Sequence, residues 1–419
     1  MAFNNTTPRA RLASMQDGAL RGAILVGVGL AVGQVMAYLL SLVAARSLGP
    51  DGYGVFGSML ALLMVGGVLA LGIQAAGAKR VVLAKPHGRS SAGSGIVRWS
   101  LSAALGIAIA TAVVSPAVTW LLHLDGPWLV ILVALNLAPF TVGGSLLGVA
   151  QGREAYARLA AIYAVIGIGR AIGGIVIVVV TQSLIWTLVG MAIGTWVAVA
   201  ACWLLAKPLV NWPGEKLANF RLEVFHATHA LLALFVLTNL DVLLARHFLT
   251  AEEAGLYAVG AVVTKIAFWL PQFVATIAFP RLTDHRRAAT LTKGALAVVL
   301  IGTASVAFVA LFPSFVVAFI GGSAYEELVS EIWIFAAIGA SFALAQFLLY
   351  SQIAASKRGA IVVLWIAAAL LIGLVIAFHA SVLQIALIVL GVALTLSLVG
   401  LVELFFERSK EGRVAQYAN

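Results

Sequence analysis

Three charged residues lie inside long apolar stretches of the sequence, where a charge is costly. Arg170 and Lys265 each lie about twelve residues into such a stretch, roughly 18 Å deep if the stretch is a helix. Asp241 lies inside a third stretch. Ionisable groups in such surroundings suggest a functional site. The two cations can hold an anionic ligand, and the desolvated carboxylate can bind a coupling proton or sodium ion.

Each of these residues also has a purely structural explanation. A lone buried cation can bind backbone carbonyls or a hydroxyl, and Asp241 can pair with Lys265 or Arg246 in a static lock. Gly169 and Gly173 flank the buried arginine in a small-xxx-small pattern, which is typical of close helix packing. Such packing does not prevent the arginine from facing a ligand.

Other polar residues of the apolar stretches are weaker candidates for substrate binding. Arg21 can meet a ligand phosphate at an entrance or simply extend to lipid headgroups. Gln34 and Asn239 can hydrogen-bond ligand hydroxyls or a neighbouring helix. The same two alternatives apply to the remaining intramembrane amides, which are Gln74, Asn136, Gln272 and Gln346.

A second group of residues is suited to gating or coupling. Arg46 and Arg246 occupy short connections between apolar stretches, and Asp241 lies five residues before the second of them. Pro271 is the preferred bending point, because proline interrupts a helix. The other prolines expected to bend spans are Pro139 and Pro313. His226 and His229 have helical spacing, but no carboxylate completes a metal set, so neither a metal nor a cofactor is predicted.

The apolar stretches read as membrane spans. The chain of 419 residues is 62% hydrophobic and only 10% charged, with a mean hydropathy of +1.07, too apolar for a soluble domain. Alternating segments of about ten residues, the pattern of a β-barrel, do not occur. The sequence therefore predicts an all-α polytopic membrane protein with spans at 20–45, 53–76, 99–122, 127–150, 159–180, 183–206, 228–248, 253–279, 291–320, 328–354, 359–379 and 382–405.

Basic residues alternate between the two sides of these spans. All but four of the 26 Lys and Arg residues fall on one side, the exceptions being Arg46, Arg170, Arg246 and Lys265. The positive-inside rule then predicts that both termini are cytoplasmic. Because the net charge of +10 is spread over short loops, it indicates topology rather than nucleic-acid binding.

Two hairpins about 200 residues apart share a pattern. Residues 45–56 (ARSLGPDGYGVF) join the first two spans, and residues 245–257 (ARHFLTAEEAGLY) join spans seven and eight; with one inserted residue, their Arg, Gly and aromatic positions coincide. Thr250 and Glu253 also form a capping box, so the hairpins have a structural role whether or not they gate. The pattern predicts two six-helix repeats of the same orientation around a central cavity.

The repeat divides the chain into three parts. The prediction is an N-terminal lobe at 1–206, a cytoplasmic linker at 207–227 and a C-terminal lobe at 228–419. The linker contains prolines and mixed charges, and it separates the two groups of six spans.

The two hairpins resemble those of a known family. Residues 45–56 look like the first-hairpin signature of polysaccharide (O-antigen, Wzx-type) flippases of the MATE-like MOP superfamily. Residues 239–246 with 253–258, and Phe279-Pro280-Arg281-Leu282, resemble the corresponding second-half segments. The likeness covers the organisation of essentially the whole chain, but it does not identify the sugar.

The resemblance implies a function and a location. Members of that family move undecaprenyl-pyrophosphate-linked oligosaccharide from the cytoplasmic to the periplasmic leaflet of the bacterial inner membrane by alternating access. Lipid-linked oligosaccharide and membrane lipids are the implied partners, with a polysaccharide polymerase or glycosyltransferases as further candidates. The alternatives are a cation-coupled multidrug exporter of the same superfamily and a lipid II flippase, although lipid II flippases typically have fourteen spans.

An enzyme is disfavoured by the sequence. Neither a Gly-x-x-x-x-Gly-Lys-Ser/Thr phosphate loop nor a His-Glu-x-x-His zinc helix occurs. The predicted exterior loops are also too short to hold the large exterior domain that membrane glycosyltransferases and ligases use. A transporter is therefore expected.

Overall fold

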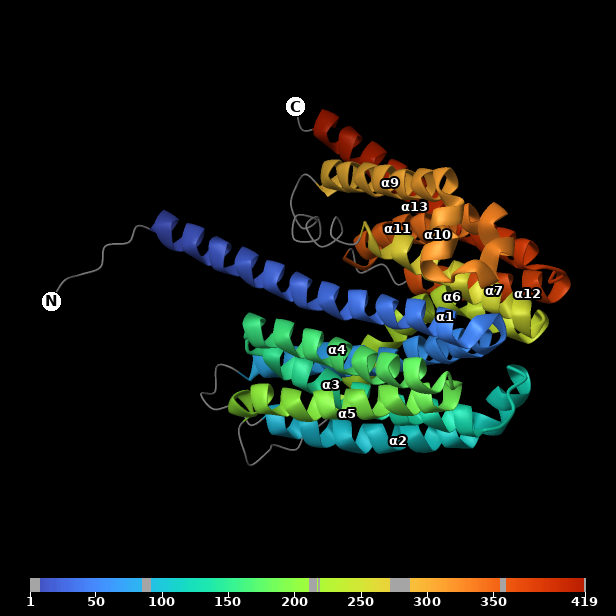
Figure 1. Cartoon of the computed structure of the whole chain (residues 1–419). Coiled ribbons are helices and arrows are strands. Elements are labelled where there is room, and N and C mark those ends of the chain that lie inside the picture. Colours follow the sequence, from blue (N-terminus) through green and yellow to red (C-terminus); the bar gives the residue numbers. More distant parts are fainter. Residues whose placement is uncertain are drawn as a thin grey trace. The chain divides into compact units, whose positions relative to one another are not determined.

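The computed structural model describes residues 8–84, 92–210, 217, 219–271, 287–354 and 359–417. Within these residues all regular structure is helical (Figure 1). The first helix is α1 (Pro8–Leu83), and the next four are α2 (Ala92–Leu121), α3 (Trp128–Gly152), α4 (Tyr156–Thr181) and α5 (Leu184–Ala206). The second half contains α6 (Phe220–Phe248), α7 (Ala251–Trp269), α9 (Arg287–Leu311), α10 (Pro313–Ile320), α11 (Ile332–Ala354), α12 (Gly359–Ala377) and α13 (Val382–Tyr417). Two 3₁₀ segments lie at Lys207–Leu209 and Ser323–Ser330.

The continuous α1 contains a sharp break in its middle. Gly49 has a left-handed φ of 67° and an extended ψ of 178°, and Pro50 follows it inside the helix. Glycine adopts a positive φ at low cost, and proline is tolerated in the first turn of a helix. The break therefore separates α1 into the first two predicted spans.

The described helices accommodate the predicted membrane spans. Nine helical stretches of these residues are long and apolar enough to cross a bilayer, and one of them, Arg21–Leu83, has 63 residues and is broken at Gly49. Counting that stretch twice and adding α7 and the shorter apolar α12 gives twelve crossings. The prediction of an all-α polytopic membrane protein is confirmed.

Several helix ends differ from the predicted spans. Helix α6, which corresponds to the predicted seventh span, begins at Phe220 rather than near residue 228. Phe220 is fully buried and packs edge-on against Trp99, which stabilises the extra turns. The predicted ninth span is divided at Phe312, and Pro313 begins α10. Helix α7, which corresponds to the predicted eighth span, ends at Trp269, two residues before Pro271. The rest of the predicted eighth span, including Gln272, lies outside the described residues.

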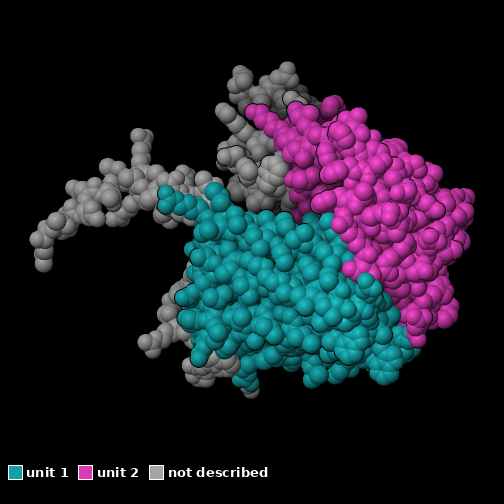
Figure 2. Space-filling model, in the orientation of Figure 1, with its two compact units in different colours: residues 1–43, 66–118, 126–231 teal, residues 44–65, 119–125, 232–419 magenta. Residues whose placement is uncertain are grey.

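The chain divides into two compact units, which Figure 2 shows in teal and magenta. Unit 1 comprises residues 1–43, 66–118 and 126–231, and unit 2 comprises residues 44–65, 119–125 and 232–419. Unit 2 thus contains the hairpins of both predicted repeats. The predicted lobes and linker stay predictions.

Unit 1 is packed through rows of glycine. On α4, Gly169 and Gly173 face Gly194 and Gly190 of α5 so closely that a Cβ at any of the four would collide with the facing backbone. This contact confirms the close packing that the small-xxx-small pattern predicted. A second row on α3 (Gly144, Gly148 and Gly152) faces α1 at Ala70, Gln74 and Ala78.

Unit 2 is packed through side chains as well as through backbone contacts such as that of Gly339 with the carbonyl of Thr264. Gly260 and Gly294 face the rings of Phe335 and Phe347 rather than another backbone. The hydroxyl of Thr264 on α7 donates a hydrogen bond of 2.8 Å to the carbonyl of Phe335 on α11. Rings and hydroxyls therefore fill the spaces between these helices.

Candidate functional site

Arg170 lies half-buried on α4 of unit 1, fourteen residues from the start of the helix. Its guanidinium carbon is 5.4 Å from the centre of the Phe140 ring on α3, which is within cation–π range. Among the described residues no hydrogen bond or ion pair reaches Arg170. The arginine therefore keeps the hydrogen-bonding capacity of its guanidinium while an aromatic ring supports it.

The other two unit 1 candidates for substrate binding lie on the first half of α1. Arg21 is exposed and Gln34 is half-buried, and neither makes a side-chain hydrogen bond within the described residues. Helix α1 approaches α4 closely there, since a Cβ at Gly33 would lie 3.4 Å from the carbonyl oxygen of Tyr163. Both side chains are thus uncommitted.

Two of the intramembrane amides in unit 1 bond between helices. Asn136 of α3 donates 3.0 Å to the carbonyl of Leu188 on α5. Gln74 of α1 donates 2.8 Å to Gln151 of α3 and 2.6 Å to the hydroxyl of Tyr163 on α4. Interhelical bonding, one of the two alternatives open for these amides, therefore occurs at both.

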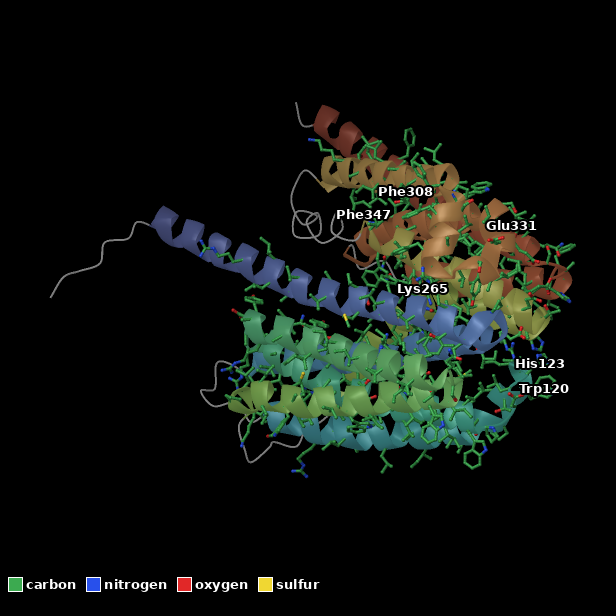
Figure 3. All side chains as sticks on the ribbon, viewed as in Figure 1. Trp120, His123, Lys265, Phe308, Glu331 and Phe347 are labelled. Atoms are coloured by element: carbon green, nitrogen blue, oxygen red, sulfur yellow. The ribbon has the colours of Figure 1, made fainter. Side chains whose placement is uncertain are left out.

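Asp241 lies on α6 of unit 2 and is 3% exposed. Its Oδ2 accepts a hydrogen bond of 3.2 Å from the hydroxyl of Tyr257 on α7, and it interacts electrostatically with Lys265, two turns further along α7. Its Oδ1 is buried and has no hydrogen-bond partner within the described residues. Figure 3 labels Lys265. The structure thus brings an acid, a phenol and a cation together inside unit 2.

Asn239 is buried two residues earlier on the same helix. Its amide nitrogen donates 2.9 Å to the carbonyl of Phe235, one turn back, while its Oδ1 is buried without a partner in the part of the chain that the structure describes. Asn239 therefore has one acceptor atom, its Oδ1, available to bind a ligand.

Arg246, at the end of α6, binds the carboxyl end of α2. Its Nε donates 3.1 Å to the carbonyl of Leu122, and a terminal nitrogen donates 3.2 Å to that of His123. The carbonyls at the end of a helix lack intrahelical partners and carry partial negative charge. A guanidinium supplies both the hydrogen-bond donors and the positive charge that they lack. Arg246 acts as a side-chain cap for α2 and does not pair with Asp241.

Arg46 makes the corresponding contact from the first half of the chain. One of its terminal nitrogens donates to the carbonyls of Ala318 and Phe319, at 2.9 and 2.7 Å, near the end of α10. The hydroxyl of Tyr325 adds a bond of 3.1 Å to the carbonyl of Ala45. Burial raises the pKa of Tyr325 above its ordinary value, so this hydroxyl keeps the proton that it donates.

The two arginine contacts are reciprocal. Arg46 lies at the end of the first span of the first predicted repeat and binds α10, in the third span of the second predicted repeat. Arg246 lies at the end of the first span of the second predicted repeat and binds the end of α2, the third span of the first. The two hairpins also touch each other: Gly255 lies so close to Pro50 that a Cβ at Gly255 would collide with the backbone of Pro50. We call the part of unit 2 where both hairpins turn, at Gly49 and Thr250, the hairpin end.

Histidines surround the arginine cap of α2. His247 lies 2.6 Å from the carbonyl of Leu121, and its ring stacks on that of His123 with centroids 5.2 Å apart. Trp120 lies beside them, and Figure 3 labels Trp120 and His123 near the end of α2. These rings cover the contact that Arg246 makes.

No group of three or more potential metal ligands occurs among the described residues. His226 and His229 are exposed on α6, and the ring of Phe225 packs against both.

Several residues of the site were not foreseen from the sequence. Phe140, Tyr163, Gln151 and Tyr325 each contact a predicted residue or its neighbour across a helix boundary. Tyr257 had a signal, since it is the aromatic residue of the second hairpin pattern. Glu403 of α13 lines an apolar pocket together with Gln346 of α11, and no sequence pattern connects the two.

Comparison with known proteins identifies the fold. No family model matches the sequence, and no curated protein is similar to it. Among solved structures, the lipid II flippase MurJ in an inward closed conformation aligns with a TM-score of 0.73 and 11% identity, over 92% of this chain and 87% of that one. An inward-facing multidrug resistance MATE family transporter of the MOP superfamily aligns with a TM-score of 0.69 and 13% identity, over 94% and 100%.

A third structure is a MOP superfamily transporter from Pyrococcus furiosus, which is described as having a binding pocket of reverse polarity. It has a TM-score of 0.61 and 14% identity, over 93% of this chain and 96% of that one. All three are transporters or flippases rather than enzymes. The chain is thus a multi-pass helical membrane protein with the fold of the MOP-superfamily transporters.

Proposed function

We propose that this protein is a flippase that moves a pyrophosphate-linked, lipid-anchored oligosaccharide from the cytoplasmic to the periplasmic leaflet of a bacterial inner membrane. Movement occurs by alternating access of a central site to the two sides. Arg170 and Lys265 bind the pyrophosphate, Arg21 meets it at the entrance, and Gln34 and Asn239 offer amide groups to the saccharide.

The observation that carries the proposal is the state of Arg170. A cation inside a membrane-spanning helix without an acidic partner is costly unless a ligand or another group compensates it. Arg170 has a ring beneath it and no acid or carbonyl bonded to it among the described residues. A pyrophosphate oxygen pair fits the fork of such a guanidinium, because two parallel N–H donors face two acceptors.

Unit 2 supplies the coupling step of the proposal. Asp241, which Tyr257 holds by a hydrogen bond, competes with the substrate for the charge of Lys265. When Asp241 takes up a proton, its negative charge is lost and no longer competes with an anionic substrate for Lys265. Binding of substrate and of the proton are then linked, each favouring the other. A sodium ion is the alternative coupling ion.

The hairpin end supplies the gate of the proposal. The charge pattern predicts that the hairpin end faces the periplasm. In the proposal, the contacts of Arg46 and Arg246 hold that side closed. Opening breaks these contacts and moves the two hairpins apart at Gly255 and Pro50. Pro271, next to the end of α7, is the bending point for that motion.

Two further candidate functions have support. A multidrug exporter is favoured by the fold shared with MATE transporters, but a site for cationic drugs calls for acids where Arg170 lies. A lipid II flippase is favoured by the fold shared with MurJ, whose own chain extends beyond the aligned part.

The test is transport by purified protein in liposomes. One set contains fluorescent undecaprenyl pyrophosphate carrying an oligosaccharide, and a matched set measures efflux of a cationic dye. The wild type is expected to move the lipid-linked saccharide. Arg170→Ala and Lys265→Ala are each expected to slow this movement at least about tenfold, because hydrogen bonds to charged groups contribute about 1.5–3 kcal/mol.

Exposed cations provide the matched controls. Arg98→Ala on α2 and Lys293→Ala on α9 remove a charge of the same kind from an exposed side chain, and both are expected to transport normally. Dye efflux without lipid movement would assign the protein to the exporters and overturn the proposal. Full activity of the Arg170 and Lys265 double variant would overturn the anion site.

A further inference from the structure

Three polar side chains from three helices meet in unit 1. The glycine row of α3 allows α1 to approach so closely that a Cβ at Gly148 would lie 2.8 Å from the carbonyl oxygen of Gln74. That approach brings the side chain of Gln74 to Gln151, three residues along α3, and to Tyr163 of α4. We call Gln74, Gln151 and Tyr163 the amide–phenol cluster.

The cluster has more hydrogen-bonding groups than it uses internally. Gln74 donates both of its amide hydrogens, one to the Oε1 of Gln151 and one to the hydroxyl oxygen of Tyr163. This leaves the amide hydrogens of Gln151, the hydroxyl hydrogen of Tyr163 and the Oε1 of Gln74 without partners among the described residues. Exchanging the O and N atoms of both amides changes which atoms are left over but not their number.

The unused groups are within reach of a ligand. Gln74 is 8% exposed and serves as the buried centre that orients the other two. Gln151 is exposed at the end of α3, and Tyr163 is half-buried. A ligand can therefore contact the amide of Gln151 and the hydroxyl of Tyr163 without entering the helix packing.

The cluster lies in line with Arg170. Tyr163 and Arg170 are seven residues apart on α4, which puts them on the same helix face about 10 Å apart along the axis. Gln151 and Phe140 are likewise eleven residues apart on one face of α3. A ligand with an anionic group at Arg170 extends along α3 and α4 to the cluster.

From this arrangement we infer that the amide–phenol cluster is the subsite for the first sugar units of the substrate. The inference rests on the proposed function and adds the residues that recognise the saccharide. Amides and phenols carry no charge and both donate and accept, which matches sugar hydroxyls, since these do the same. The pyrophosphate binds at Arg170, and the sugars next to it bind at Gln151 and Tyr163.

The test separates recognition of the sugar from recognition of the pyrophosphate. Liposomes are prepared with fluorescent undecaprenyl pyrophosphate, either bare or carrying an oligosaccharide, and the two transport rates are compared for each variant. Tyr163→Phe and Gln151→Met are expected to lower the ratio of glycosylated to bare lipid about 3- to 10-fold, because each removes neutral hydrogen bonds to the sugar. Arg170→Ala is expected to slow both lipids alike.

The controls exclude a structural effect. Tyr156→Phe removes a phenol seven residues earlier on the same face of α4, outside the cluster, and is expected to leave the ratio unchanged. Gln151 is exposed, so its variant folds even if Tyr163→Phe does not. An unchanged ratio in both cluster variants, or equal slowing of both lipids, would overturn the subsite while leaving the flippase intact. Failure of the wild type to move either lipid would instead overturn the proposed function, and the subsite with it.

Discussion

Unit 1 and the hairpin end of unit 2 are held together in different ways. In unit 1 the helices α4 and α5 touch backbone to backbone at four glycines, and the rows on α3 and α1 repeat that contact. At the hairpin end, Arg46, Arg246 and Tyr325 bond to single carbonyls at or near helix ends. The first kind of contact is a row of backbone contacts along two helices, whereas the second combines separate bonds with one close backbone approach, where Gly54 and Gly255 bring the two hairpins together.

This difference separates a rigid part from a part that can open. Backbone surfaces in van der Waals contact lose much of their attraction when they separate by a fraction of an ångström. We therefore expect α4 and α5 to move as one body. A guanidinium bonded to helix-end carbonyls can exchange those bonds for water at a cost of a few kcal/mol. The hairpin end therefore suits a reversible closure, and unit 1 suits a fixed frame for Arg170.

The largest effect is expected from a side chain inserted into the glycine contact. Gly173→Leu forces a branched side chain against the backbone of Gly190, which is expected to destabilise the protein by about 3 kcal/mol or prevent folding. Thermal unfolding in detergent measures this loss. Gly106→Leu on α2 is the matched control, because a Cβ there meets no atom within 4 Å. Equal losses in both variants would remove the distinction between a packed and a free glycine.

An intermediate effect is expected at the hairpin end. Arg246→Ala removes two bonds to the end of α2, and at about 2 kcal/mol this shifts the balance toward an open hairpin end roughly 30-fold. Maleimide labelling of a cysteine at the buried Ala258, in a Cys202→Ser background, reports that opening. Arg46→Ala is expected to act equally, and Arg98→Ala not at all. Unchanged labelling in both hairpin variants would mean that other contacts keep this end closed.

The smallest effect is expected from an ion pair in unit 1. Arg80 and Glu223 are joined at 2.8 Å, with side chains 27% and 32% exposed. Water and salt screen such a pair, so a double-mutant cycle with alanine at both positions is expected to give a coupling below about 1 kcal/mol. A coupling as large as the effect of Arg246→Ala would show that side-chain bonds hold unit 1 as strongly as they hold the hairpin end.

The fold could be predicted because its signals do not depend on knowing which helices are neighbours. Apolar length and the alternation of basic residues define the spans. Pro50 after Gly49 indicates the break in α1, and Thr250 with Glu253 gives the capping box that the structure contains. The early start of α6 was missed because polar residues hide it from hydropathy, although burial of Phe220 stabilises it.

The candidate site could be predicted only in part. Charges inside apolar stretches stand out, so the sequence alone singles out Arg170, Asp241 and Lys265 as candidates. Their partners Phe140 and Tyr257 are ordinary residues of apolar helices, and only the packing brings them into contact. The carbonyls that the two arginines bind have no sequence signature at all, since every residue has one.

The reciprocal arginines also bear on how the hairpin end can open. Each half of the chain supplies one guanidinium and one set of helix-end carbonyls, and each completes the other. This exchange is the pattern seen across a two-fold axis, where the same pair of groups meets twice. The hairpin end thus has two anchor points of the same kind, so losing one arginine leaves the other contact in place and opening of this end requires both to be broken.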